Sequence, residues 1–304
     1  MKERSGVSWA SLGITSFVCL VMFSLLFAGG PRAVFNNQAL RWNVNNPDTF
    51  PVRYVIDNGP LGEGLSRDQG AALVRQGFQK WEDVSTSTMR FLDSGFLDMD
   101  IGVDNYQSFV FTGQPRPENP VIFDSDGSII DDQFGVDAKE SVLGFAVVPS
   151  SDPETLEFLS GWMVLNGTLA SEIGLFPRVM AHEIGHLIGL DHTQINLPLA
   201  FNSNSTDDLL VPLMFPVALP NGPGAPIRDD MSWISWMYPS GNFRNSTGTI
   251  QGNIMRRTGD VFQGANVVAV QVDAEGQESQ EEVVSVVSSF LGTDGSYEIP
   301  GLTP

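Results

Sequence analysis

HEIGHLIGLDH, residues 182–192, holds all three histidines of this 304-residue chain. His182 and His186 are four positions apart, so on a helix their side chains share one face. Gly189 allows the backbone to leave helical geometry, which lets His192 return to the same point. The stretch therefore predicts three imidazole rings that converge.

The residues around this stretch predict a helix that ends at Gly189. Pro177 suits a first helical turn, where the missing N–H costs nothing, and glycine is a natural helix stop. Apolar residues recur at helical spacing along the same stretch, namely Val179, Met180, Ile184, Leu187 and Ile188. The sequence thus places two of the histidines on one amphipathic helix.

Three neutral imidazoles are a typical ligand set for one Zn²⁺ ion, and a fourth position then stays open to water, as in catalytic zinc sites. Glu183, next to the first histidine, is placed to take a proton from that water. The alternative is that His182, His186 and His192 are ordinary histidines of a surface or a core. A chance match to this pattern in such a chain has a probability on the order of one in 10⁵, which favours zinc.

Charge and cysteine content restrict the function further. The chain has 16 basic and 36 acidic residues, a net charge of 16 − 36 = −20. Nucleic-acid binding requires clustered cations, so it is excluded as a function class. Hydrophobic residues make up 42% of the chain, which suffices for a globular core. Cys19 is the only cysteine, so an intrachain disulfide is impossible.

The first domain that the sequence predicts, residues 1–33, is a signal peptide or an N-terminal anchor. Residues 13–28 are uncharged and mostly apolar, and they follow Lys2 and Arg4. Small residues between Ala28 and Ala33 suit cleavage. Either alternative predicts an exported protein, secreted or anchored at its N-terminus, and cleavage removes Cys19. Contact with a membrane is expected only through this segment.

Residues 34–240 form the second predicted domain. Pro51–Ile56 has the pattern of a strand, and a helix is expected after Ser66, a suitable N-cap. Short strands are expected at Met89–Phe91 and Met99–Val103, and Pro216–Pro226 is expected to be a loop.

Residues 241–304 alternate apolar and polar residues in short runs, as strands with one solvated face do. Strands are expected from Gly248, at Val283–Val287 and at Ser296–Ile299, with a polar loop at Ala274–Glu282. The module resembles the start of a carboxypeptidase regulatory-like β-sandwich in the residues Gly248, Ile250, Gly252, Gly264, Ala265 and Val267. Because the module is small for a sandwich, we expect it to be incomplete here.

A calcium loop is a further hypothesis. Asp124, Asp126, Ser128, Asp131 and Asp132 concentrate oxygen ligands of the kind that Ca²⁺ prefers. The same residues suit a solvated Asp-Gly turn in an acidic protein. Both alternatives stay open.

The pattern HExxHxxGxxH at 182–192 resembles the zinc motif of the metzincin proteases. A Met-turn follows this motif in that clan, and Leu213–Pro216 is similar to it. The resemblance implies that Met214 forms an apolar floor beneath the metal and is not a ligand.

Within the clan the chain resembles the matrixins over about 200 residues. Their features are matched by Arg41-Trp42, by Phe78 to Trp81, by Asp191, by Leu213–Pro216, by Asp229-Asp230 and by Tyr238. The resemblance implies an α+β zincin fold, a twisted mixed sheet with a long active-site helix, followed here by the partial all-β module. Latency through a propeptide cysteine is excluded because Cys19 lies in the export segment. No histidine precedes His182, so one zinc ion is expected and a second, structural one is not.

The resulting prediction is a secreted zinc-dependent endopeptidase. Its bound zinc polarises the scissile carbonyl and activates a water, and Glu183 acts as the general base and acid. The expected partner is a protein or peptide substrate, while the oligomeric state stays open. The alternative is a catalytically silent binding or adhesion module that keeps the zincin fold. The presence of Glu183 argues against this alternative, because a silent module has no chemical need for that carboxylate.

Overall fold

The computed structural model describes residues 29–110, 116–169, 174–194 and 197–304. The apolar segment 13–28 and Cys19 lie outside these residues, so the signal peptide and the anchor both remain predictions. Within the described ranges, no helix combines the length and apolar character needed to cross a membrane.

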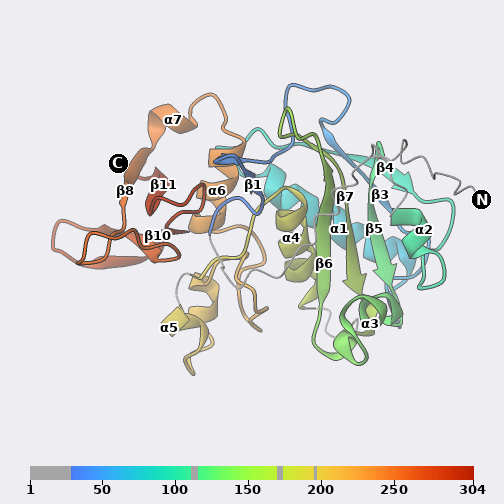
Figure 1. Cartoon of the computed structure of the whole chain (residues 1–304). Helices are drawn as coiled ribbons and strands as arrows, with labels where there is room; N and C mark the ends of the chain where they lie inside the picture. Colours follow the sequence, from blue (N-terminus) through green and yellow to red (C-terminus); the bar gives the residue numbers. More distant parts are fainter. Residues whose placement is uncertain (1–28, 111–115, 170–173, 195–196) are drawn as a thin grey trace, which may run out of the picture.

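A five-stranded mixed sheet forms the centre of the larger part of the molecule (Figure 1). Its strands follow the order β4 (Phe91–Phe96), β3 (Val52–Ile56), β5 (Asn119–Asp124), β7 (Phe158–Asn166) and β6 (Gly144–Ser151). The first four run parallel, whereas β6 pairs antiparallel with β7 and forms one edge. The sheet and its helices confirm the predicted α+β fold. Because β6 is the last strand in the order, its outer edge has no strand partner within this sheet.

Two helices pack against each other along the sheet, α1 (Arg67–Glu82) and α4 (Phe176–Leu187) (Figure 1). Ser66 caps α1 as predicted, and it forms a capping box with Gln69. The helix α4 begins one residue before Pro177 and ends just before Gly189, close to the predicted bounds. It also contacts β6 and β7, which places it directly beneath the antiparallel edge of the sheet.

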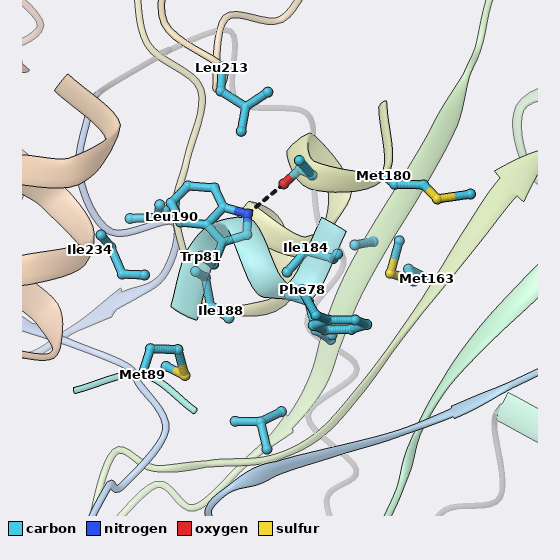
Figure 2. Packing of buried hydrophobic residues seen from close by; sticks show 14 of the residues in the cluster. Phe78, Trp81, Met89, Met163, Met180, Ile184, Ile188, Leu190, Leu213 and Ile234 are labelled. Carbon is cyan, nitrogen blue, oxygen red and sulfur yellow. Dashed lines mark hydrogen bonds between the residues drawn. The ribbon is translucent and has the colours of Figure 1, made fainter. Parts of the chain in front are cut away.

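The core fixes α4 by both packing and a hydrogen bond. Figure 2 shows Trp81 of α1 among apolar side chains from several elements, including Ile184 of α4 and Ile234 of a later helix. The indole nitrogen Nε1 of Trp81 donates to the carbonyl of Ala181 over 2.7 Å (Figure 2). Because this carbonyl directly precedes His182 in the chain, the contact restrains the part of α4 that carries the histidines.

Shorter elements complete the fold. They are the strands β1 (Val34–Phe35) and β2 (Gln38–Ala39), the helices α2 (Tyr106–Val110), α3 (Ser128–Phe134), α5 (Leu197–Ala200) and α7 (Phe243–Ser246), and the 3₁₀ turns η1 (Ala138–Glu140), η2 (Gly167–Leu169) and η3 (Asp207–Leu210). Two expected strands differ from the structure. The strand expected at 99–103 is wrong, and the strand expected at 89–91 begins only at Phe91, where β4 starts. The N–H of Ile101 donates to the carboxylate of Asp57 over 3.1 Å, so a side chain takes the place of a strand partner there.

The C-terminal residues form two antiparallel pairs, β8 (Gly248–Asn253) with β11 (Ser296–Leu302) and β9 (Asn266–Val272) with β10 (Glu278–Val287). The strand β10 starts inside the expected loop 274–282. Both pairs contact the helix α6 (Arg228–Met237), as Figure 1 shows in orange and red. Three of their side chains, Val284, Val286 and Ile299, belong to the same core cluster as Trp81. The domain boundary at 241 and the sandwich architecture remain predictions.

A buried carboxylate joins this C-terminal region to the rest. Asp229 of α6 accepts a 2.7 Å hydrogen bond from the N–H of Ser285 in β10. The Ser285 hydroxyl lies 3.1 Å from that of Thr193, the residue after the third histidine. Burial and, to a smaller extent, the neighbouring charge of Asp230 together raise the pKa of Asp229 to about 7. Folding therefore places an ionisable group in an environment that favours its neutral form.

We expect Asp229 to make the stability depend on pH. Its pKa of about 7 in the folded protein exceeds that of an unfolded aspartate, about 3.9, so the folded state binds this proton more tightly. The resulting stabilisation is complete below about pH 4 and is lost as the pH rises through about 7. When the pH rises from 5 to 8, the wild type should therefore lose about 3 kcal/mol more of its free energy of unfolding than Asp229→Asn does.

Urea unfolding at a series of pH values measures this difference. The control is Asp98→Asn, which changes an exposed aspartate. The same pH dependence in the wild type and Asp229→Asn would contradict the assignment.

Candidate metal centre and active site

Local backbone geometry brings the three histidines to one point. His182 and His186 project from α4, and the chain then turns at Gly189, whose φ is +95°. This conformation favours glycine, and a Cβ there would lie 2.7 Å from a ring carbon of Phe158. A side chain at this position is therefore excluded twice, by backbone strain and by lack of space. The turn returns His192 to the helix.

The distances between the ring nitrogens fit a single tetrahedral ion. Nε2 of His192 lies 3.2 Å from Nε2 of His182 and 3.0 Å from Nε2 of His186. Nitrogens bound tetrahedrally to zinc at about 2.0–2.1 Å are separated by about 3.3–3.4 Å. The three rings form the one group in the described part of the chain whose His, Cys, Asp and Glu ligand atoms cluster closely enough for a metal ion.

The opposite side of two rings is held by backbone carbonyls. Nδ1 of His182 donates to the carbonyl of Leu213 over 2.7 Å, and Nδ1 of His186 donates to that of Leu190 over 2.8 Å. These bonds place the protons on Nδ1, so the Nε2 lone pairs face the common centre. Burial lowers the pKa of His182 to about 4 and that of His192 to about 3. The rings are therefore neutral at pH 7, as metal binding requires.

Met214 packs against α4 between the two histidines of that helix. A Cβ added to Gly185, between the two histidines of α4, would meet the Met214 sulfur at 2.3 Å, so the thioether packs directly on the helix backbone. The carboxylate of Asp230 holds the turn, because it accepts hydrogen bonds from the N–H groups of Leu213 and Met214 at 2.9 and 3.0 Å. Met214 is 2% exposed and contributes an apolar floor.

Glu183 follows His182 on α4 and is buried next to the strand β6, where a Cβ on Gly144 would lie 3.2 Å from its Cγ. Its side chain is 5% exposed, and Oε2 has no hydrogen-bond partner among the described residues. Burial raises the pKa of Glu183 to about 8, although the positive charge of Arg32 opposes this shift. A buried carboxylate oxygen without a partner is costly in a protein. It is the arrangement expected of a group whose partner is a water, a substrate or a cation.

Arg32 is a residue that the sequence analysis did not assign to the site. Its Nη1 donates to the carbonyl of Ala146 in β6 over 2.7 Å. Its charge influences the pKa of all three histidines and of Glu183, which places it beside the centre. The one signal in the sequence is that Arg32 is the sole basic residue between Arg4 and Arg41.

The loop expected at 216–226 runs beside α4 and is tied to it by Arg178. The guanidinium donates to the carbonyls of Gly222 at 2.7 Å and of Pro220 and Pro223 at 3.3 Å. Because Arg178 lies one helical turn before His182, it positions this loop relative to the histidines.

The carboxylates of the expected calcium loop have partners within the chain. Asp124 accepts from the N–H groups of Ile129 and Ile130 at the start of α3. Asp131 forms a 3.2 Å ion pair with Lys139. The remaining candidates are also engaged, since Asp126 accepts from the N–H of Ser128 and Asp132 accepts from the hydroxyl of Tyr106. These contacts suit a structural turn, and calcium binding stays a prediction.

Comparison with known proteins identifies one family. The family model described as matrixin matches residues 41–206, more than half of the chain. This range contains the three histidines, Glu183 and the whole five-stranded sheet. A search of the curated proteins finds no match.

Proposed function

The chain belongs to the matrixin family of zinc metallopeptidases, and we propose that it is a secreted endopeptidase with one catalytic zinc ion held by His182, His186 and His192. The observation that carries the proposal is the convergence of the three Nε2 atoms, on a helix that also carries a buried Glu183 oxygen without a partner among the described residues. Secretion is supported by the uncharged segment 13–28.

The arrangement suits the hydrolysis of a peptide bond. When bound, zinc polarises the scissile carbonyl and lowers the pKa of the attacking water. Glu183 accepts the proton of that water through its free carboxylate oxygen and later delivers it to the leaving amine. The backbone groups at the outer edge of β6 can pair with an extended peptide. Glu183 lies next to this strand, because a Cβ on Gly144 would be 3.2 Å from its Cγ. The carboxylate and the edge strand therefore act on the same bound chain.

The proposal predicts activity that depends on the metal. Cleavage of a fluorogenic peptide library should stop when 1,10-phenanthroline removes the metal, and stoichiometric Zn²⁺ should restore the cleavage. The reason is that the three histidines are the one described side-chain cluster that could hold the metal ion required as a Lewis acid. The library also reports the preferred residues around the scissile bond. A protein that binds zinc through the three histidines but cleaves no peptide would instead be the silent binding module.

A further inference from the structure

The residues just before the first strand are bound to the loop that carries the third histidine. The N–H of Arg32 donates to the carbonyl of Gly189 over 2.7 Å, and the N–H of Asp191 donates to the carbonyl of Gly30 over 2.9 Å. Pro31 and Leu190 form an antiparallel bridge between these two bonds. We call residues 29–32 the N-terminal strap. The strap is thus fixed as a short strand alongside the metal loop.

The other side of the strap packs against α6 and β10. Gly29 and Gly30 are buried, and a Cβ on Gly29 would lie 2.7 Å from the carbonyl oxygen of Ser285 and 3.1 Å from Nε1 of Trp233. Gly30 has a φ of +120°, which a residue with a side chain rarely adopts. Both glycines allow the close approach that brings Arg32 to the site.

From this position the Arg32 side chain extends to the edge strand. Its bond to the Ala146 carbonyl spans 114 residues of sequence and joins the strap to β6. This carbonyl is one of the groups through which an extended peptide would pair with β6. Arg32 therefore occupies a position that a substrate backbone needs.

The electrostatic environment makes this contact exchangeable. The Arg32 side chain is partly buried, and none of the ion pairs within 4.0 Å in the described residues includes it. Burial lowers the pKa of Arg32, and the negative charges of Asp191 and Glu183 oppose this shift. A cation at the centre repels a neighbouring guanidinium. The hydrogen bond and the attraction of the two carboxylates thus favour the contact, whereas burial of the charge and a cation at the centre oppose it.

We propose that the N-terminal strap is an intramolecular competitor of peptide substrates, with Arg32 closing the edge strand β6 until the strap is displaced. The proposal rests on the proposed function, because it concerns access to the same site. It also offers a form of latency that needs no thiol, in a chain whose single cysteine is Cys19.

The test compares Arg32→Ala with Arg41→Ala in the zinc-loaded full chain. Arg41 is a matched control, because its Nη1 also donates to a backbone carbonyl, that of Met237, over 3.0 Å. Arg32→Met keeps the aliphatic stem packed and serves if the alanine variant folds poorly. The probe is a tripeptide hydroxamate, whose dissociation constant is measured by calorimetry and does not depend on catalysis. Acetohydroxamate, which has no peptide to pair with β6, is the reference ligand.

Loss of one hydrogen bond to a charged group should tighten tripeptide hydroxamate binding by about tenfold in both Arg32 variants. The dissociation constant of acetohydroxamate should stay at the wild-type value in the Arg32 variants. In Arg41→Ala, the dissociation constants of both hydroxamates should stay at the wild-type values. The KM for peptide cleavage should fall in parallel.

Equal or weaker binding of the tripeptide hydroxamate to the Arg32 variants would overturn the proposal. An equal gain for acetohydroxamate would also overturn it, because Arg32 would then act through its charge and not through β6. If no variant cleaves any peptide but the tripeptide hydroxamate still binds the Arg32 variants more tightly, the proposed function fails while the strap remains a competitor.

Discussion

Replacement of Glu183 by glutamine is expected to lower kcat for peptide hydrolysis by about 10²–10⁴-fold, the usual contribution of a general base, without loss of zinc. Glutamine has nearly the same shape but cannot accept the proton of the attacking water. The carbonyls of Leu213 and Leu190 orient His182 and His186, so these two rings do not depend on Glu183. The metal content should therefore stay at the wild-type level.

Two comparisons make this result specific. Glu140→Gln changes an exposed glutamate of η1 and should leave kcat unchanged. His186→Ala removes a proposed ligand and should lower zinc content and activity together. Metal analysis by mass spectrometry and peptide cleavage on the same samples give both readouts. Wild-type kcat in Glu183→Gln would rule out this carboxylate as the base.

The convergence of the three histidines could be predicted from the sequence because its geometry is local. The histidine spacing along α4 and the turn at Gly189 determine where the rings meet, and all of this lies within eleven residues, 182–192. The Met-turn required more, because only the resemblance to metzincins related Met214 to the helix. Its position depends on Asp230, which bonds to the turn from another element.

Arg32 could not be assigned to the site, because its role depends on long-range contacts. It bonds to the carbonyl of Ala146, 114 positions away in β6, and to that of Gly189, just after α4. The strand expected at 99–103 was wrong for a similar reason, since the carboxylate of Asp57, 44 positions away, bonds to Ile101. Apolar alternation predicts a strand but does not reveal a side chain that replaces the strand partner.

The C-terminal strands, whose boundary at residue 241 remains a prediction, contribute buried side chains to the core cluster that contains Trp81. Ile299 of β11 is 1% exposed and belongs to the cluster that contains Trp81 and Ile234. Ile250, its direct partner across the β8–β11 pair, is 49% exposed. The two isoleucines are paired in the same strand ladder but differ in burial, so they form a matched pair for substitution.

Ile299→Ala should lower the free energy of unfolding of the whole protein by about 2–5 kcal/mol, because it leaves a cavity in the shared core. Ile250→Ala should cost less than about 1 kcal/mol, since its side chain is half exposed. Urea unfolding followed by tryptophan fluorescence and by loss of zinc should give one coincident transition in each variant, shifted mainly in Ile299→Ala. If the C-terminal strands formed an independent module, Ile299→Ala would lower only the stability of that module. Two separate transitions, with zinc release unaffected by the substitution, would then contradict the shared core.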